Sequence, residues 1–182
     1  MSEVFVVSGV QAVGKSTVAA GLAKRYARGV HVAGDGIRAM VVSGRVDMSQ
    51  DADAEATRQL VLRYQGSIAV ARLYHEADFD VVIEDVIIGP MLDEFLSLLP
   101  WPRVHVVVLD PDPQEVARRE QARAKNAYGK SWSIEALHRI LREQTPRRGL
   151  WLDSSRLTPD ETVDAILADP EASLVDVPAL TP

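Results

Sequence analysis

The hydrophobic residues of the chain gather in five short runs that are rich in β-branched side chains. The runs cover residues 4–8, 30–33, 79–83, 103–109 and 150–152. Most of them are almost continuously apolar and do not alternate with polar residues, a pattern typical of strands that are buried on both faces. We therefore predict a parallel sheet that helices cover on both sides.

Six further stretches are predicted to be helices. In residues 51–76, Leu60, Tyr64, Ile68 and Ala71 recur at helical spacing and form one apolar stripe. Residues 112–115 and 158–161 each combine a capping residue, a proline and a glutamate in the order that begins a helix. The other predicted helices cover residues 17–28, 90–99 and 133–144. Strands that alternate with helices predict a three-layer α/β sandwich, with the ligand site at the carboxyl ends of the strands.

Length and composition restrict the number of domains, the possible chemistry and the cellular location. The 182 residues predict a single domain, residues 1–182, with a loose acidic tail at about residues 169–182. The absence of cysteine excludes disulfides, thiol catalysis and cysteine-based metal sites. The sequence has no apolar run of membrane-spanning length and no signal-peptide pattern at its start, so we expect a cytoplasmic protein without a membrane partner.

The net charge of −6 is distributed unevenly. Residues 1–117 contain 10 basic and 16 acidic side chains, whereas residues 118–148 contain 9 basic and 3 acidic ones. Nucleic acids and anionic membranes recruit proteins through clustered lysine and arginine, so the acidic body argues against these partners. The basic segment is still suited to binding a smaller anion.

The most specific motif lies between the first predicted strand and the helix that follows it. The pattern G-x-x-x-x-G-K-[ST] is matched in full by Gly9, Val10, Gln11, Ala12, Val13, Gly14, Lys15, Ser16 and Thr17. In such a loop the backbone N–H groups face phosphate, Lys15 reaches the β- and γ-phosphates, and Ser16 offers its hydroxyl to Mg²⁺. Thr17 would help to hold the α-phosphate. A glycine-rich turn with an exposed lysine is the structural alternative, but the strand before the loop and the helix after it favour an ATP site.

Asp35 and Arg38 follow the second predicted strand, at the same edge of the sheet as the phosphate-binding loop. A carboxylate there can accept the proton of an attacking hydroxyl and orient its oxygen toward the γ-phosphorus. Arg38, one helical turn later, can hold the substrate or a phosphoryl oxygen. The alternative is that Asp35 caps the next helix and that Arg38 is a solvated surface residue.

Together, the loop at 9–17, the turn at 34–38 and the later arginine-rich segment resemble a small P-loop kinase. The layout is similar to that of the chloramphenicol phosphotransferase-like proteins, and polynucleotide 5′-kinase domains share it. The resemblance, which covers residues 4 to about 167, implies a nucleoside monophosphate kinase-like fold with a five-stranded parallel sheet and a small helical lid at about residues 119–133. It also implies that Asp35 is the base for a substrate hydroxyl; in the polynucleotide kinases an arginine at the spacing of Arg38 accompanies that aspartate.

Two acidic residues, Glu84 and Asp85, interrupt the third predicted strand near its carboxyl end. Successive strand residues face opposite sides of a sheet, so the two side chains cannot both point at one ligand. The kinase resemblance favours Asp85 as a contact to the substrate or the metal shell. A structural role of Asp85 in the following loop is the alternative.

The basic segment places Arg119 and Arg123 four residues apart, on one face of a predicted helix. Two guanidinium groups there can spread over phosphate oxygens, as in the lid of a P-loop kinase, with residues 126–130 as the cover that excludes water. A solvated basic face is the alternative. By the same resemblance, Ser155 and Arg156 are expected to lie beside the adenine.

These features predict an ATP- and Mg²⁺-dependent phosphotransferase that acts on a hydroxyl of a small molecule, for example an antibiotic or a metabolite. Lys15, Arg119 and Arg123 would neutralise the transferring phosphoryl group. One alternative is a polynucleotide 5′-hydroxyl kinase, against which the acidic body argues. The other is a nucleotide-binding regulator or an NTPase without an acceptor.

Overall fold

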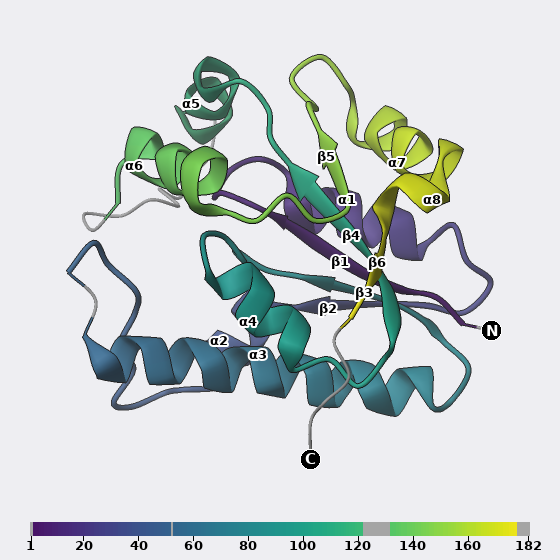
Figure 1. Cartoon of the computed structure of the whole chain (residues 1–182), viewed down its shortest axis with the longest axis horizontal. Coiled ribbons are helices and arrows are strands. Elements are labelled where there is room, and N and C mark those ends of the chain that lie inside the picture. The colour runs from purple at the N-terminus through teal and green to yellow at the C-terminus, as the bar shows by residue number, and fades with distance from the viewer. Residues whose placement is uncertain (1, 52, 122–131, 178–182) are drawn as a thin grey trace.

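The computed structural model describes residues 2–51, 53–121 and 132–177, which form a six-stranded sheet with helices around it (Figure 1). Five strands are parallel and follow the order β2-β3-β1-β4-β5, and β6 pairs antiparallel with β4. The strands are β1 (Val4–Gly9), β2 (Gly29–Ala33), β3 (Asp80–Glu84), β4 (Arg103–Leu109), β5 (Leu150–Leu152) and β6 (Leu174–Asp176). The predicted α/β class and its five parallel strands are thus confirmed.

Helices connect the strands, and all six predicted helical stretches contain one. The helical elements are α1 (Lys15–Ala23), α2 (Gly34–Ala39), α3 (Ala54–His75), α4 (Met91–Ser97), α5 (Pro113–Gln121), α6 (Ile134–Arg139), the π-helical η1 (Ile140–Gln144), α7 (Pro159–Ala168) and α8 (Pro170–Ser173). The predicted start of α7 is a capping box, in which the Thr158 hydroxyl accepts from the Glu161 backbone N–H at 3.2 Å and the Glu161 carboxylate accepts from the Thr158 backbone N–H at 2.8 Å.

The core explains why the strand segments are apolar without alternation. Every residue of β1 is buried, and so is every residue of β4 after Arg103. In Figure 1, α1 lies behind the sheet and α4 in front of it, so the central strands have an apolar layer on each side. Burial on both faces removes the polar positions that a half-exposed strand would show.

The strand register brings the candidate residues to one edge of the sheet. Gly9, at the end of β1, pairs with Leu109 of β4, and Glu84, at the end of β3, pairs with Val7 of β1 and Ala33 of β2. The phosphate-binding loop, the start of α2 and the two acidic residues after β3 therefore emerge side by side at the carboxyl ends of the strands.

The C-terminal part differs from the expected loose tail. Residues 170–176 form α8 and β6, and β6 pairs with the first residues of β4. The Ser173 hydroxyl bonds to Nδ1 of His105 at 2.8 Å, and Val177 is buried. Residues 178–182 and most of the predicted lid, residues 122–131, lie outside the described residues. In the described segments, no helix has both the length and the apolar character needed to cross a membrane.

Candidate active site

The phosphate-binding loop joins β1 to α1 and turns at Gly14. Gly14 has a φ of 99°, which favours glycine, and α1 begins at the next residue, Lys15. The Lys15 ammonium is buried and donates to the Val10 carbonyl at 2.8 Å. Burial lowers the pKa of Lys15, although the nearby carboxylates of Glu84 and Asp85 act to raise it. The lysine therefore lies against the loop backbone, within the electrostatic field of two acidic side chains.

Ser16 and Glu84 form the part of the site that fits a divalent cation. The Ser16 hydroxyl donates to Oε1 of Glu84 at 2.8 Å, and Nε2 of His31 lies 3.8 Å from the same oxygen. Burial alone would raise the pKa of Glu84, but His31, Lys15 and Ser16 together hold it below its ordinary value. A hydroxyl beside an ionised carboxylate offers the hard oxygen donors that Mg²⁺ prefers, and the phosphates and water would complete its shell.

Asp85 points to a different partner. Its Oδ1 accepts hydrogen bonds from the Arg63 guanidinium of α3 and from the Val86 backbone N–H, while its Oδ2 is buried without a partner. Burial raises the pKa of Asp85 to about 6, although the charge of Arg63 acts in the opposite direction. In the structure Asp85 thus joins β3 to α3, and Glu84 is the acidic residue beside Ser16.

Asp35 lies in the first turn of α2 and faces solvent, with 79% of its side chain exposed. The N-cap of α2 is Ala33 and has no side-chain cap bond, so the capping alternative for Asp35 is wrong. Nε of Arg38 lies 3.3 Å from Oδ1 of Asp35, and Nη1 of Arg38 donates to Oδ1 of Asp47 at 2.9 Å. The predicted pair is therefore present, and its arginine is also tied to the segment that follows α2.

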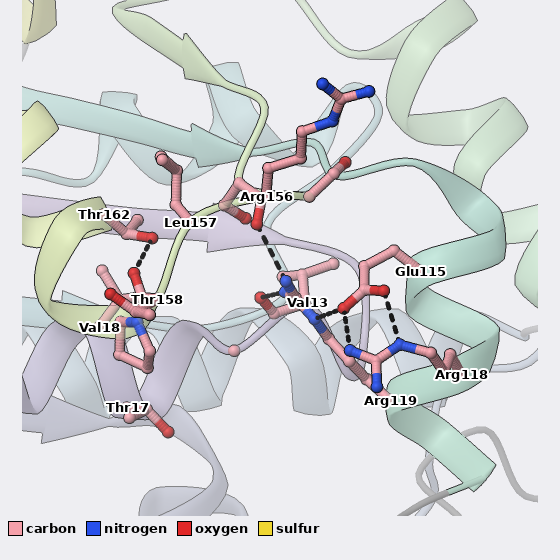
Figure 2. A pocket seen from close by; sticks show the side chains of 14 residues that line it. Val13, Thr17, Val18, Glu115, Arg118, Arg119, Arg156, Leu157, Thr158 and Thr162 are labelled. Carbon is pink, nitrogen blue, oxygen red and sulfur yellow. Dashed lines mark hydrogen bonds and ion pairs between the residues drawn. The ribbon is translucent and has the colours of Figure 1, made fainter.

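A pocket of about 390 Å³ opens beside the phosphate-binding loop (Figure 2). Three segments form its walls: the loop and the start of α1, helix α5, and the connection between β5 and α7. Its lining residues are Val13, Gly14, Thr17, Val18, Glu115, Arg118, Arg119, Ser154, Ser155, Arg156, Leu157, Thr158, Pro159 and Thr162. The structure thus brings Ser155 and Arg156 next to the phosphate-binding loop, where the kinase resemblance expects the nucleotide base.

Arg119 crosses from one wall of this pocket to the others. It donates to the Val13 carbonyl at 3.1 Å, to the Ser154 carbonyl at 2.9 Å and to the Glu115 carboxylate at 2.7 Å (Figure 2). In this conformation its guanidinium holds the pocket together. Arg123, its predicted companion, lies outside the described residues.

Several residues of the site were not identified from the sequence. Glu115 holds both Arg118 and Arg119, at three- and four-residue spacing along α5 that the sequence does display. Arg63 and His31, by contrast, carry no local signal, because Arg63 is 22 residues from Asp85 and His31 is far from Glu84 in sequence. The pairing of β2 with β3 brings His31 to Glu84, and the packing of α3 brings Arg63 to Asp85.

Comparison with solved structures shows the fold. A sugar kinase from Janibacter sp. HTCC2649 is 20% identical, with a TM-score of 0.67 over 95% of this chain and 96% of that one. The tunicamycin resistance protein of Deinococcus radiodurans is 15% identical, with a TM-score of 0.66 over 96% of this chain and 99% of that one. A chain of the Pnkp1/Rnl/Hen1 RNA repair complex is 14% identical, with a TM-score of 0.55 over 100% of this chain and 50% of that one.

At these identities the likeness is one of fold alone, and it confirms the predicted P-loop kinase architecture. Among curated proteins none matches the sequence. The profile of the AAA domain, however, matches residues 4–146, from the start of β1 to beyond η1. With this match and a complete phosphate-binding loop, the chain belongs to the AAA domain family and has the P-loop kinase fold.

Proposed function

We propose that the protein is an ATP- and Mg²⁺-dependent phosphotransferase that moves the γ-phosphoryl group to a hydroxyl of a small molecule, such as an antibiotic or a metabolite. The observation that carries the proposal is the position of the exposed Asp35 carboxylate at the same sheet edge as the buried Lys15. Burial lowers the pKa of Lys15, and the negative charge of Asp35 acts in the opposite direction, together with the nearer acidic residues. Hydroxyl phosphorylation needs a phosphate site and a carboxylate that an acceptor can reach, and the exposed Asp35 and the phosphate-binding loop at one sheet edge offer both.

In the proposed reaction, the base of ATP occupies the pocket beside Arg119, and its phosphates lie on the N–H groups of residues 9–17. Ser16 would hold Mg²⁺, with Glu84 orienting the Ser16 hydroxyl or a metal-bound water. The bound Mg²⁺ would neutralise charge on the β- and γ-phosphates. Lys15 would leave the Val10 carbonyl to contact the transferring group, with Arg119 and Arg123 as further candidates for that role.

Asp35 would act on the acceptor. Its carboxylate faces solvent, so an incoming hydroxyl can donate to it. As the acceptor oxygen bonds to the γ-phosphorus, the bond from that phosphorus to ADP breaks and the hydroxyl proton passes to Asp35. Arg38 orients the carboxylate.

The sequence has no cysteine, so we further place this ATP-dependent reaction in the cytoplasm.

The test is a transfer assay with labelled ATP across hydroxylated antibiotics, nucleosides, sugars and 5′-hydroxyl oligonucleotides. We expect Asp35→Asn to lower transfer at least about 100-fold, with the dissociation constant for ATP changed less than about twofold, because Asp35 lies outside the nucleotide pocket. Asp93→Asn is the matched control, since Asp93 is also a first-turn carboxylate with an arginine partner. Undiminished transfer by Asp35→Asn would refute the assignment of the base.

Two observations favour a polynucleotide 5′-kinase as the second candidate: Arg38 accompanies Asp35, and the fold is shared with a chain of an RNA repair complex. The same assay separates the candidates. Transfer to the oligonucleotide that falls steeply with added salt would support this second function. An ATP hydrolysis rate that changes neither on addition of any acceptor nor in Asp35→Asn would instead indicate a regulator or an NTPase.

A further inference from the structure

The segment between α2 and α3 exposes an unusual group of apolar side chains. In the described residues, seven large hydrophobic side chains are exposed, and four of them lie within residues 40–46, which we term the apolar loop. Met40 is 71% exposed and Val42 is 94% exposed; the others are Val41 and Val46. Single exposed apolar residues are common, whereas a cluster of this kind marks a surface that binds something.

The apolar loop is held in place. The Gln59 side chain of α3 donates to the Gly44 carbonyl at 2.9 Å and accepts from the Val46 backbone N–H at 2.9 Å. After the loop, Asp47 accepts from Arg38 at 2.9 Å. A loop fixed at its middle and at its end presents its apolar side chains to solvent in a defined arrangement, which lowers the entropic cost of binding.

The position of the loop connects it to the proposed acceptor site. It directly follows α2, and Arg38 contacts both Asp35 and Asp47. From the other side, Nε1 of Trp132 donates to the Met48 carbonyl at 2.9 Å. Figure 1 shows the α2–α3 segment at the same side of the molecule as the start of α6. The apolar loop is thus linked to Asp35 through α2 and Arg38, and Met48, just beyond the loop, is linked to Trp132.

The charged side chains around Asp35 and the apolar loop attract an anionic acceptor only weakly. Within the described part of residues 34–63, every arginine is paired with a carboxylate: Arg38 with Asp35 and Asp47, Arg45 with Asp47, Arg58 with Glu55, and Arg63 with Asp85. The same stretch contains five acidic residues and four arginines. A phosphate or carboxylate on the acceptor would have to displace one of these carboxylates.

Building on the proposed phosphotransferase function, we propose that the acceptor is an uncharged compound with an apolar body. Its body packs on Met40 and Val42 of the apolar loop, and its hydroxyl reaches Asp35. The loop supplies the apolar contact, and the paired arginines discriminate against anions.

The first test measures binding of Nile red, an uncharged apolar dye, by fluorescence. We expect the double variant Met40→Ser/Val42→Ser to weaken dye binding about tenfold, because it removes most of the apolar contact area. Leu73→Ser is the matched control, because Leu73 is 66% exposed near the C-terminal end of α3, away from Asp35. It should change the affinity less than about twofold. Equal dye affinity in the two variants would overturn the proposal.

The second test measures displacement of the dye by 2-phenylethanol and by its carboxylate analogue, 4-(2-hydroxyethyl)benzoate. The protein should prefer the uncharged alcohol about tenfold. Asp47→Asn removes the carboxylate that Arg38 and Arg45 share and should reduce that preference severalfold. A preference for the carboxylate, or a preference that Asp47→Asn leaves unchanged, would contradict the charge argument.

These outcomes separate the present inference from the proposed function. Neither dye binding nor displacement requires phosphoryl transfer, so an apolar site without transfer to any acceptor would refute the phosphotransferase alone. If the protein is an active kinase but Met40→Ser/Val42→Ser leaves its dye affinity unchanged, the proposal of an apolar acceptor would be refuted. Sedimentation that shows a dimer converted to a monomer by these substitutions would assign the apolar loop to a second copy of the chain and overturn the proposal.

Discussion

At the scale of single residues, Glu84 and Asp85 divide two tasks between neighbouring positions. Because successive strand residues face opposite ways, Glu84 reaches Ser16 while Asp85 reaches Arg63. Both carboxylates are buried, yet the pKa of Glu84 is lowered and that of Asp85 is raised to about 6, the first by its partners and the second by burial. The first is therefore suited to a cation and the second to fixing α3.

This division predicts different responses to Mg²⁺. Glu84→Gln keeps an oxygen that can accept from Ser16 but removes the negative charge, so the Mg²⁺ concentration for half-maximal activity should rise about tenfold or more. Asp85→Asn is the control and should leave that concentration within about twofold of the original. Titrating the ATP-dependent reaction with MgCl₂ measures both. A larger shift for Asp85→Asn than for Glu84→Gln would reverse the assignment.

The local sequence pattern identifies some of these site residues but not others. Residues 9–17 carry a contiguous motif whose chemistry depends on its own backbone, so the sequence identifies it directly. The choice between Glu84 and Asp85 depends on which face of β3 meets Ser16, and the Arg63 partner depends on where α3 packs. Both are consequences of topology, which a single sequence does not display. For that reason the kinase resemblance favours Asp85 as the residue near the metal or the substrate, whereas the structure places Glu84 beside Ser16.

At the scale of elements, the start of α2 is packed directly on Asp85. A Cβ atom on Gly34 would lie 1.9 Å from Oδ2 of Asp85 and 2.4 Å from its Cγ. Asp85 cannot easily move, because Arg63 and the Val86 backbone N–H hold its other oxygen. Only glycine therefore allows α2 to begin at this position, which places Asp35 at the same sheet edge as the phosphate-binding loop.

We accordingly expect Gly34→Ala to displace the first turn of α2. Stability should fall by roughly 1–3 kcal/mol, and transfer should fall more than about tenfold through misplacement of Asp35. Gly36→Ala is the matched control in the same helix, because a Cβ there meets nothing within 4 Å. It should be neutral or stabilising by up to about 1 kcal/mol. Urea denaturation and the transfer assay measure both variants, and equal effects would contradict the packing argument.

The elements themselves were largely predictable, for a physical reason. Strands buried on both faces and helices with capped starts leave strong local patterns, so β1 to β5 and α3, α5 and α7 follow from the sequence. The last elements did not, because α8 and β6 are short and acidic residues surround their apolar positions. β6 exists because the edge of β4 accepts it, which is a tertiary effect.

At the scale of the whole molecule, the two ends of the sheet have different tasks. The candidate site occupies the carboxyl ends of the strands, at Gly9, Glu84 and Ala33. The C-terminal segment covers the amino end of β4, where β6 pairs with residues 103–105 and Ser173 bonds to the buried His105. The C-terminal segment that covers the core and the candidate active site therefore lie at opposite ends of the strands.

This separation predicts that a chain ending at Asp169 is less stable but keeps its nucleotide site. Removal of residues 170–182 exposes the edge of β4, leaves Nδ1 of His105 without Ser173 and uncovers the pocket of Val177, so stability should fall by roughly 3 kcal/mol, or about 10 °C in Tm. Arg103→Gln is the control: it removes only the exposed ion pair with Asp176 and should cost less than about 1 kcal/mol. Below its melting temperature, the shortened chain should bind ATP within about twofold of the full chain, because no residue of the pocket lies beyond Thr162. Calorimetry and ATP titration measure the two quantities. Loss of ATP binding in a chain that is still folded would show that the two ends of the sheet are coupled.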